Sequence, residues 1–499
     1  MALNELVVQL REGLEPLKAA EARRSWQQAL GAAVPDLSPR LGEPFARAES
    51  FHAVREAMGS ASERARGRLR SLLALCASEH EARGAAAAQE ARERLATQPL
   101  AEDAPGLTLA LAVHAIEREP HRERRVALSR ALANAHRSLS SPGRQQLELA
   151  ARSAESLGAA GPLALRDEVA GIAHLRWAEG AEAFERDTRG AFHELLAYGL
   201  GRTTQGVRPA PRGEAEAHDV HHAARAPWLD GLLPREDLLP ALQHWTESIG
   251  FGWKAGGRIR VALDEGPREL PPMAVGLAIP GDIRLAVRRE RGLEGWRALL
   301  GAVATAQSLA HADPGSPPED RRLGDPAVRA LWPQLFELLL LEPRWLMRYA
   351  RVTGNQAREL VRFAAFAQLL RLRTRAASHG FNAWVLSRGS TAGLEEAWVE
   401  RARHALQAEA SASSAWVALD PSLHAVHDLR AAALVEPLRL MLQERYDEDW
   451  WRNPAGGHFL KSLFARGGRD SVEQLATELG CATLSLQPVA ARLLRTMEG

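Results

Sequence analysis

The sequence contains only two cysteines and has no long uninterrupted hydrophobic run. Cys76 and Cys481 lie far apart and cannot build a disulfide framework, which is typical of a protein in a reducing compartment. No segment approaches the roughly eighteen consecutive apolar residues of a membrane-spanning helix, and the chain does not begin with a basic segment followed by a long apolar run. We therefore expect a cytoplasmic protein without a membrane partner.

A surplus of charge of one sign is also lacking. The 499 residues include 63 basic and 62 acidic side chains, which leaves a net charge of +1. The chain therefore has no electrostatic footprint for nucleic acid, and nucleic-acid binding is not expected. Only three of the basic residues are lysines, a bias typical of bacterial genomes rich in G and C. Hydrophobic residues make up 46% of the chain, which is average for a soluble globular protein.

The spacing of the apolar residues predicts a mainly helical chain. From Leu3 to about Gly199, apolar residues recur every three or four positions, and prolines divide this segment into seven or eight expected helices. The segment Arg202 to Asp219 is rich in Gly, Pro and charge, which favours an exposed connection. We therefore divide the chain into an N-terminal helical region (1–201), a connection (202–219) and a second domain (220–499).

Sequences typical of β-strands occur at three places in the second domain. The short runs 259–264, 274–279 and 283–287 are separated by segments rich in Gly and Pro, and they predict a small antiparallel sheet. A helix is expected before them, at about 235–249, and another after them, at 293–312. The predicted fold class is mainly α with a small antiparallel β-sheet.

The search for catalytic motifs gives few positive results. The sequence has no P-loop, no GxSxG turn, no CxxC pair and no dinucleotide-binding fingerprint, so no cofactor is expected. His218, Asp219, His221 and His222 form the densest cluster of potential ligands, and His218 shares a helical face with His221 or His222. These histidines are candidate metal ligands, and the alternative is a polar helix end.

Three segments in sequence order carry a family resemblance. AVGLAIPGDIRLAV (274–287) resembles a strand, turn and strand that border a substrate cleft. WRALLGAVATAQSLAHADP (296–314) stands where the family has the helix "ALLHExxHALHFA". RRLGDPAVRALWPQLFELLLLEPRWL (321–346) is similar to the family's "AVTEGFAFLFEHLLLDPxWL". The family is that of the zinc oligopeptidases related to oligoendopeptidase F and thimet oligopeptidase, and with weaker flanks the resemblance covers about 215–480. It implies a two-lobed, oligopeptidase-like helical fold around a central cleft.

The resemblance also implies that the catalytic residues have been lost. Carried over position by position, the first histidine ligand becomes Gly301, the general-base glutamate Ala302, the second histidine Thr305, and the glutamate ligand Ala330. A catalytic zinc needs three protein ligands and a carboxylate that takes the proton of its water. The motif reads Gly301-Ala-Val-Ala-Thr305, so we expect neither zinc nor peptidase activity, and we interpret the chain as a pseudoenzyme. The old cleft is expected to be open or to be filled by Trp332.

Peptide binding is the function that this interpretation leaves. The strand Ile283 to Val287 is expected to lie at a sheet edge, where Ile283, Arg284 and Leu285 could pair with an extended peptide. Arg284, Arg321 and Arg322 could meet a carboxylate. Structural roles are favoured for these arginines, because arginine is so abundant in this chain.

Three hypotheses follow. The leading one is a catalytically inactive metallopeptidase homologue that binds a peptide or a protein partner. The second is an active hydrolase with a relocated metal, for which His218, His221 and His222 are the candidates. The third is a structural subunit that pairs with an active homologue.

Overall fold

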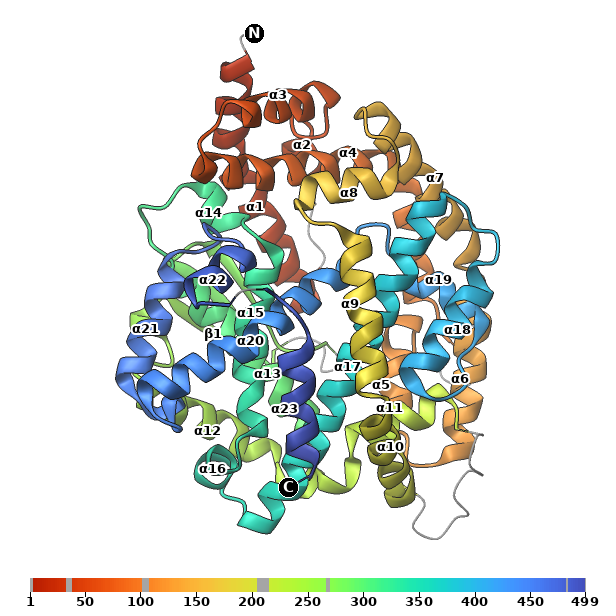
Figure 1. The fold of residues 1–499 in the computed structure, drawn as a ribbon, viewed down its shortest axis with the longest axis vertical. Coiled ribbons are helices and arrows are strands. Elements are labelled where there is room, and N and C mark those ends of the chain that lie inside the picture. Colours follow the sequence, from red (N-terminus) through yellow and green to blue (C-terminus); the bar gives the residue numbers. More distant parts are fainter. Residues whose placement is uncertain are drawn as a thin grey trace. The chain divides into compact units, whose positions relative to one another are not determined.

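The computed structural model describes residues 3–32, 38–100, 107–203, 215–265, 270–481 and 483–498. Within these residues the chain is mainly helical and contains one three-stranded sheet (Figure 1). The predicted mainly α fold with a small sheet is therefore confirmed. None of the described helices is long and apolar enough to span a bilayer.

The chain forms two compact units whose segments alternate along the sequence. Unit 1 comprises 1–79, 228–362 and 430–492, and unit 2 comprises 80–227, 363–429 and 493–499. The predicted regions 1–201 and 220–499 each contribute to both units. Most of the predicted connection, 204–214, lies outside the described residues, so the boundary stays a prediction.

The elements of unit 1 come from three parts of the chain. The first part holds α1 (Leu3–Ala29), α2 (Ser38–Gly42), α3 (Ala48–Gly59) and the beginning of α4 (Glu63–Thr97). The second holds η1 (Pro227–Leu232), α12 (Arg235–Ser248), η2 (Ala255–Gly257), β1 (Ile259–Leu263), β2 (Met273–Ala278), β3 (Asp282–Val287), α13 (Gly292–Ala310), α14 (Pro318–Arg322), α15 (Pro326–Glu337), η3 (Leu338–Leu341), α16 (Pro343–Trp345) and η4 (Leu346–Ala350). The third holds most of α20 (Ala425–Tyr446), then η6 (Trp450–Arg452), α21 (Pro454–Ala465), α22 (Val472–Glu478) and the start of α23 (Gln487–Glu498).

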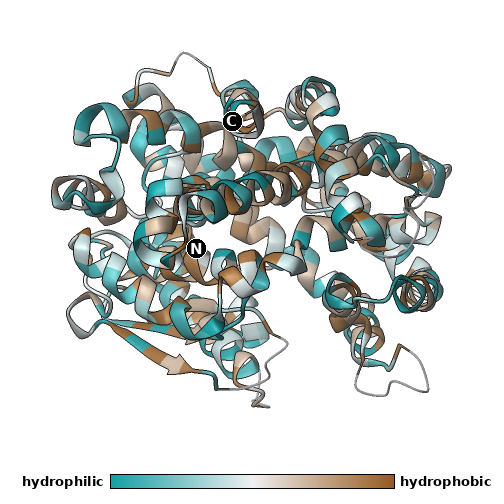
Figure 2. Ribbon diagram, turned by 90° about the horizontal axis from the view of Figure 1, so that it is seen from below, coloured by the Kyte–Doolittle hydropathy of each residue, from teal (hydrophilic) through white to brown (hydrophobic). Residues whose placement is uncertain are grey.

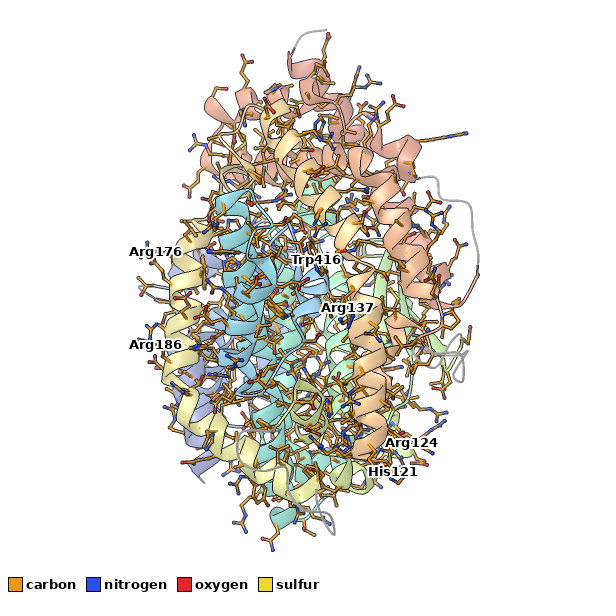
Figure 3. The ribbon with its side chains drawn as sticks, turned by 90° about the vertical axis from the view of Figure 1, so that its right-hand side faces the viewer. His121, Arg124, Arg137, Arg176, Arg186 and Trp416 are labelled. Carbon is orange, nitrogen blue, oxygen red and sulfur yellow. The ribbon has the colours of Figure 1, made fainter. Side chains whose placement is uncertain are left out.

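The described residues of unit 2 form helices and their connecting segments, and they contribute no strand to the sheet. Unit 2 contains the rest of α4, then α5 (Leu109–Arg118), α6 (Arg122–Arg137), α7 (Ser140–Ser156), α8 (Pro162–Ala170), α9 (His174–Asp187), α10 (Arg189–Thr203) and α11 (Ala217–Arg225). From the later part of the chain it takes most of α17 (Gly354–Arg388), together with α18 (Leu394–Leu406), η5 (Ala412–Ser414) and α19 (Ala415–Ala418). In Figure 3 the exposed residues Arg176 and Arg186 belong to α9, and Arg124 and Arg137 belong to α6. Trp416 of α19 is buried in the hydrophobic core of the unit.

More helices precede residue 204 than the sequence predicted. The described residues contain ten, α1 to α10, against the expected seven or eight. The difference arises because some helices end without a proline. Between α9 and α10, for example, only Thr188 interrupts the helical text, and its hydroxyl donates to the carbonyl of Phe184 at 2.7 Å. Local hydrogen bonds of this kind compete with the helix and are difficult to recognise in the sequence.

The sheet differs from the predicted antiparallel one. Its strand order is β1-β3-β2, with β2 and β3 antiparallel and β1 parallel to β3. The strand positions are as predicted, and β2 and β3 form the expected hairpin around the turn at Pro280 and Gly281. β1 and β2 are not joined by a two-residue turn, so they need not be neighbours in the sheet, and β3 lies between them.

The core of unit 1 is built around α13 and a group of aromatic rings. On β3 the buried side chains of Ile283, Leu285 and Val287 share one face, and α13 packs against the strand. The buried Trp296 of α13 meets Trp345 edge to face, with ring centroids 6.2 Å apart. Figure 2 shows the mixture of hydrophilic and hydrophobic residues along the helices that this one-sided burial requires. The predicted helix 293–312 corresponds to α13.

Candidate functional site

The four positions that the resemblance assigns to the family's catalytic residues lie on two helices of unit 1. Gly301, Ala302 and Thr305 belong to α13, and Ala330 belongs to α15. The two helices pack against each other. Gly301 faces α15, because a Cβ atom at this position would lie 3.5 Å from Cβ of Pro333. The structure therefore brings together two segments that the resemblance assigns to one site.

The start of α15 is fixed by an ion pair inside unit 1. Asp325 caps the helix, with its carboxylate accepting a hydrogen bond from the amide of Ala327 at 2.9 Å. The buried Arg430 binds both oxygens of the Asp325 carboxylate, at 3.0 and 2.7 Å, and also binds Glu473. Burial opposes ionisation of Asp325, but Arg430 and the capping bonds hold the pKa of this carboxyl below its usual value.

The side chains at the four positions do not fit a catalytic zinc. Glycine and the two alanines have no donor atoms. The hydroxyl of Thr305 donates to the carbonyl of Gly301 at 3.1 Å, one turn earlier in the helix. Zinc in proteins is bound by thiolate, imidazole and carboxylate groups, and none of these stands at the four positions. Over the described ranges as a whole, no group of three or more His, Cys, Asp or Glu side chains is placed to hold a metal ion.

An ion-pair cluster that sequence reasoning missed lies beside Gly301. Arg297 donates to Glu337 at 2.8 Å and to Glu294 at 2.8 Å. A Cβ atom at position 301 would lie 3.2 Å from the same oxygen of Glu337. Burial disfavours the charge of Arg297, but the two carboxylates outweigh it and raise the pKa of the guanidinium above its usual value. The i,i+3 spacing of Glu294 and Arg297 is readable in the sequence, whereas Glu337 is not.

Trp332 belongs to the interior of unit 1. It is buried, and its ring meets that of Phe464 on α21 edge to face, with centroids 4.9 Å apart. Its neighbour Pro333 lies inside α15 and has no amide hydrogen to donate. These contacts make Trp332 a packing residue.

The prediction that β3 is an edge strand is wrong. β3 is the central strand and pairs with β1 on one side and β2 on the other. The amide of Ile283 donates to the carbonyl of Arg258 next to β1, at 2.9 Å, whereas Arg284 is paired with Val275 of β2. The main chain of Ile283, Arg284 and Leu285 is therefore used within the sheet and cannot add a peptide strand. Local sequence shows that a segment is a strand, but not which strands flank it.

The three candidate arginines have partners inside unit 1. Arg284 binds Asp282 through two hydrogen bonds, of 2.7 and 3.0 Å. Arg321 donates to the carbonyls of Ile279 at 2.8 Å and Ser316 at 2.9 Å. The buried Arg322 has three partners: the carbonyls of Gly276 and Leu277 on β2 and the carboxylate of Glu15 on α1. These contacts give the three arginines structural roles within unit 1.

The candidate histidines lie at a junction of α5, α6 and α11 in unit 2. Asp219 accepts hydrogen bonds from Arg122 at 3.0 Å and from Arg125 at 3.2 Å. The buried His218 places Nε2 3.4 Å from Asp219. The carboxylate of Asp219, the acidic member of the cluster, is therefore hydrogen-bonded to two arginines. Their positive charges disfavour the binding of a metal cation beside it.

The other two histidines face α5. The buried His222 places Nδ1 2.8 Å from the carbonyl of Glu117, so this nitrogen carries the proton and donates it. His221 is half-buried, with Nδ1 3.7 Å from the carboxylate of Glu117. The structure therefore brings the predicted cluster together, but as part of a helix junction.

His222 is expected to make unit 2 sensitive to acid. Burial and the charges of Arg125 and Arg225 lower the pKa of His222 to about 4, against a smaller opposing effect of Asp219 and the Glu117 carbonyl. Because the pKa is lower in the folded state than the usual value near 6.5, this contribution to stability is complete above about pH 6.5 and is lost as the pH falls toward 4. Between pH 7 and 4.5, the free energy of unfolding should fall by about 1–2 kcal/mol more in the wild type than in His222→Asn, which keeps a donor but does not titrate.

Urea denaturation at the two pH values measures this difference. His121→Asn is the control, because His121 is exposed. Equal losses of stability in the wild type and His222→Asn would contradict the assignment.

Comparison with known proteins supports the fold. No protein-family model matches the sequence, and no curated protein matches it. Among solved structures, the chain is similar to Pyrococcus furiosus carboxypeptidase, with 13% identity, a TM-score of 0.62 and coverage of 99% of this chain and 98% of that one. Trypanosoma cruzi metallocarboxypeptidase 1 gives 12% identity and a TM-score of 0.59 over 99% of this chain and 100% of that one.

A protein assigned as oligoendopeptidase F from Bacillus anthracis str. Ames gives 11% identity and a TM-score of 0.57, over 93% of this chain and 83% of that one. The chain therefore has the helical fold shared by these carboxypeptidases and oligoendopeptidases. At this level of identity the similarity concerns the fold alone.

Proposed function

We propose that the protein is a catalytically inactive metallopeptidase homologue that binds a peptide or a protein partner. The observation that carries the proposal is the pair of packed helices α13 and α15 within a peptidase-like fold. The resemblance assigns the four catalytic positions on these helices to Gly301, Ala302, Thr305 and Ala330. One missing ligand could be replaced by a neighbour. The loss of all three ligands and of the general base removes both the anchors of the metal and the acceptor of the proton.

The neighbourhood of these positions supports the same proposal. Glu337 is the nearest carboxylate shown beside Gly301, and it is bound to Arg297. A carboxylate held by a guanidinium is a poor candidate for a metal ligand or a base, because both roles need lone pairs that the ion pair uses. Binding remains possible without chemistry, since recognition of a peptide needs a surface and hydrogen-bonding groups but no metal.

Catalysis and binding can be tested separately on the full-length protein. We expect no cleavage of an internally quenched peptide mixture above a no-protein control, with or without added zinc, and no stoichiometric zinc by elemental analysis. Random decapeptides equilibrated with the protein and recovered by mass spectrometry should be retained in intact form. One zinc per chain together with cleavage would refute the proposal, and failure to retain any peptide or partner would refute its binding part.

The alternative of a relocated metal has its own control. If cleavage is observed, His218→Asn and His222→Asn should abolish it when those histidines hold the metal, whereas His121→Asn should not. Cleavage by the wild type that persists in both variants would contradict the inactive homologue and would also exclude a metal held by these histidines.

A further inference from the structure

The two outer edges of the sheet in unit 1 differ in what covers them. The main-chain N–H and C=O groups of Ile283 point toward β1. Because these groups alternate in direction along a strand, those of Arg284 point toward β2. The main-chain groups of its partner Val275 therefore point toward β3, and those of the next residue, Gly276, point away from the sheet. Arg322 donates to this outward carbonyl of Gly276 and, at 3.0 Å, to that of Leu277. The helix α1 also packs against β2. The β2 edge is thus already occupied by groups of this chain.

The outer edge of β1 carries hydrogen-bonding groups that the described protein does not use. The hydrogen bonds Ile283 N to Arg258 O and Asp264 N to Val287 O show that even-numbered residues of β1 face β3. The main chain of Val261 and Leu263 therefore faces away from the sheet. Among the described residues, nothing forms a hydrogen bond with these outward groups. The side chain of Val261 is half-buried, and Leu263 is 42% exposed. We call the segment Val261–Leu263 the β1 edge.

Basic residues lie at the beginning of this strand. Lys254, Arg258 and Arg260 are exposed, and the side chain of Arg260 is 62% exposed. Asp282 lies 3.8 Å from Arg260, but it is bound more closely, at 2.7 Å, by Arg284. The charge of Arg260 is therefore only partly compensated.

At the far end of the strand the balance is different. Asp264 is bound to Arg289 at 2.9 Å, and Glu265 is exposed. The positive charge is thus concentrated at the Lys254–Arg260 end, and acidic groups of a ligand are expected opposite that end.

We infer that the β1 edge binds an extended acidic peptide, which adds a fourth strand beside β1. The inference rests on the proposed peptide-binding function and gives it a place and a ligand class. Main-chain hydrogen bonds to Val261 and Leu263 would supply affinity that is independent of sequence, and Arg260 would select acidic side chains. A proline-rich peptide lacks the N–H groups that such a strand must donate, and a basic peptide lacks acidic side chains for Arg260.

Fluorescence polarisation with a labelled octapeptide of alternating Val and Glu tests the inference. Val261→Pro removes an outward N–H without breaking a bond to β3, since proline is tolerated on the open side of an edge strand. It should weaken binding about tenfold, and so should Arg260→Glu, because each removes a directed or charged hydrogen bond. The matched control is Arg47→Glu, whose exposed arginine lies elsewhere in unit 1 and should leave binding unchanged. The peptide with Gln in place of Glu should bind more weakly than the acidic one.

The outcomes separate this inference from the proposed function. No binding of the acidic peptide, or equal binding by the wild type, Val261→Pro and Arg260→Glu, overturns the inference. If random peptides are still retained intact in that case, the proposed function stands. Cleavage of the octapeptide would overturn the proposed function instead. Circular dichroism and thermal melting show whether Val261→Pro is folded, and if it is not, Arg260→Glu and the Gln peptide still decide.

Discussion

A variant with Gly301→His, Ala302→Glu, Thr305→His and Ala330→Glu should bind one zinc ion per chain, whereas the wild type should bind none. Positions 301 and 305 are one turn apart on α13, so two histidines placed there share a helical face. Position 330 lies on α15, which packs against α13. These changes would supply the two histidines and one glutamate of a catalytic zinc site and leave the fourth coordination position for water.

The main obstacle is the space at position 301. Glu337 must shift by a few tenths of an ångström, because one of its oxygens lies 3.2 Å from the place of the new Cβ atom. The shift would weaken the ion pair with Arg297. We expect the zinc-free variant to lose about 1–3 kcal/mol of stability, as overpacked sites do. Zinc should restore stability by an amount that grows with the logarithm of its concentration over its dissociation constant, because it binds only the folded chain.

Zinc stoichiometry is measured by competition with a chromophoric chelator and by elemental analysis. The matched control carries only Ala302→Glu and Ala330→Glu, which adds the carboxylates without the two imidazoles and should bind zinc far more weakly. A folded variant with all four changes that binds no more zinc than this control would contradict the assignment of the four positions. Gain of peptidase activity is a second readout, since it also needs the carboxylate at position 302 to take a proton.

The local features of the fold could be read from the sequence, and the long-range pairings could not. The predicted helix 293–312 matches α13 (292–310), because its apolar residues repeat with helical spacing over five turns. The hairpin of β2 and β3 was also predictable, since its turn contains Pro280 and Gly281. The pairing of β1 with the far side of β3 depends on where a longer loop returns, and no local pattern specifies that.

The same distinction holds for the candidate site. The four positions are assigned by a resemblance between sequence segments in the same order, and their assignment stays a prediction. The ion pair of Arg297 with Glu337 joins residues 40 positions apart and becomes visible only when α13 packs on α15. The hydrogen bonds of Arg322 to the carbonyls of β2 are of the same long-range type. In a chain with so many arginines, their individual partners cannot be chosen from the sequence alone.

Arg373→Met should destabilise unit 2 more than any conservative change at its surface. Arg373 lies on α17 and is only 1% exposed. It donates to the carbonyls of Ala405 at 2.8 Å and His404 at 2.6 Å, near the end of α18, and to the carbonyl of Glu185 at 2.6 Å, near the end of α9. A further bond of 2.8 Å reaches the hydroxyl of Thr188.

One guanidinium therefore satisfies the terminal carbonyls of two helices, which have no partners within their own helices. Burial lowers the pKa of Arg373 to about 10, so the side chain still carries its charge at neutral pH. That charge is favourably placed at the negative ends of the two helix dipoles. Removal of the guanidinium leaves three buried carbonyls unsatisfied, and we expect a loss of about 3–5 kcal/mol in the free energy of unfolding.

Urea denaturation followed by far-ultraviolet circular dichroism measures this loss. Arg373→Lys should recover only part of the stability, because an ammonium group cannot reach carbonyls on two sides as a planar guanidinium does. The control is Arg375→Met on the same helix, where the side chain is 56% exposed and paired with Asp428 at 2.8 Å. An exposed ion pair contributes about 0–1 kcal/mol, so this variant should unfold nearly as the wild type does. If Arg373→Met were as stable as Arg375→Met, the carbonyls at the ends of α9 and α18 would have to be satisfied by water, and the joining of the two helices would not depend on the arginine.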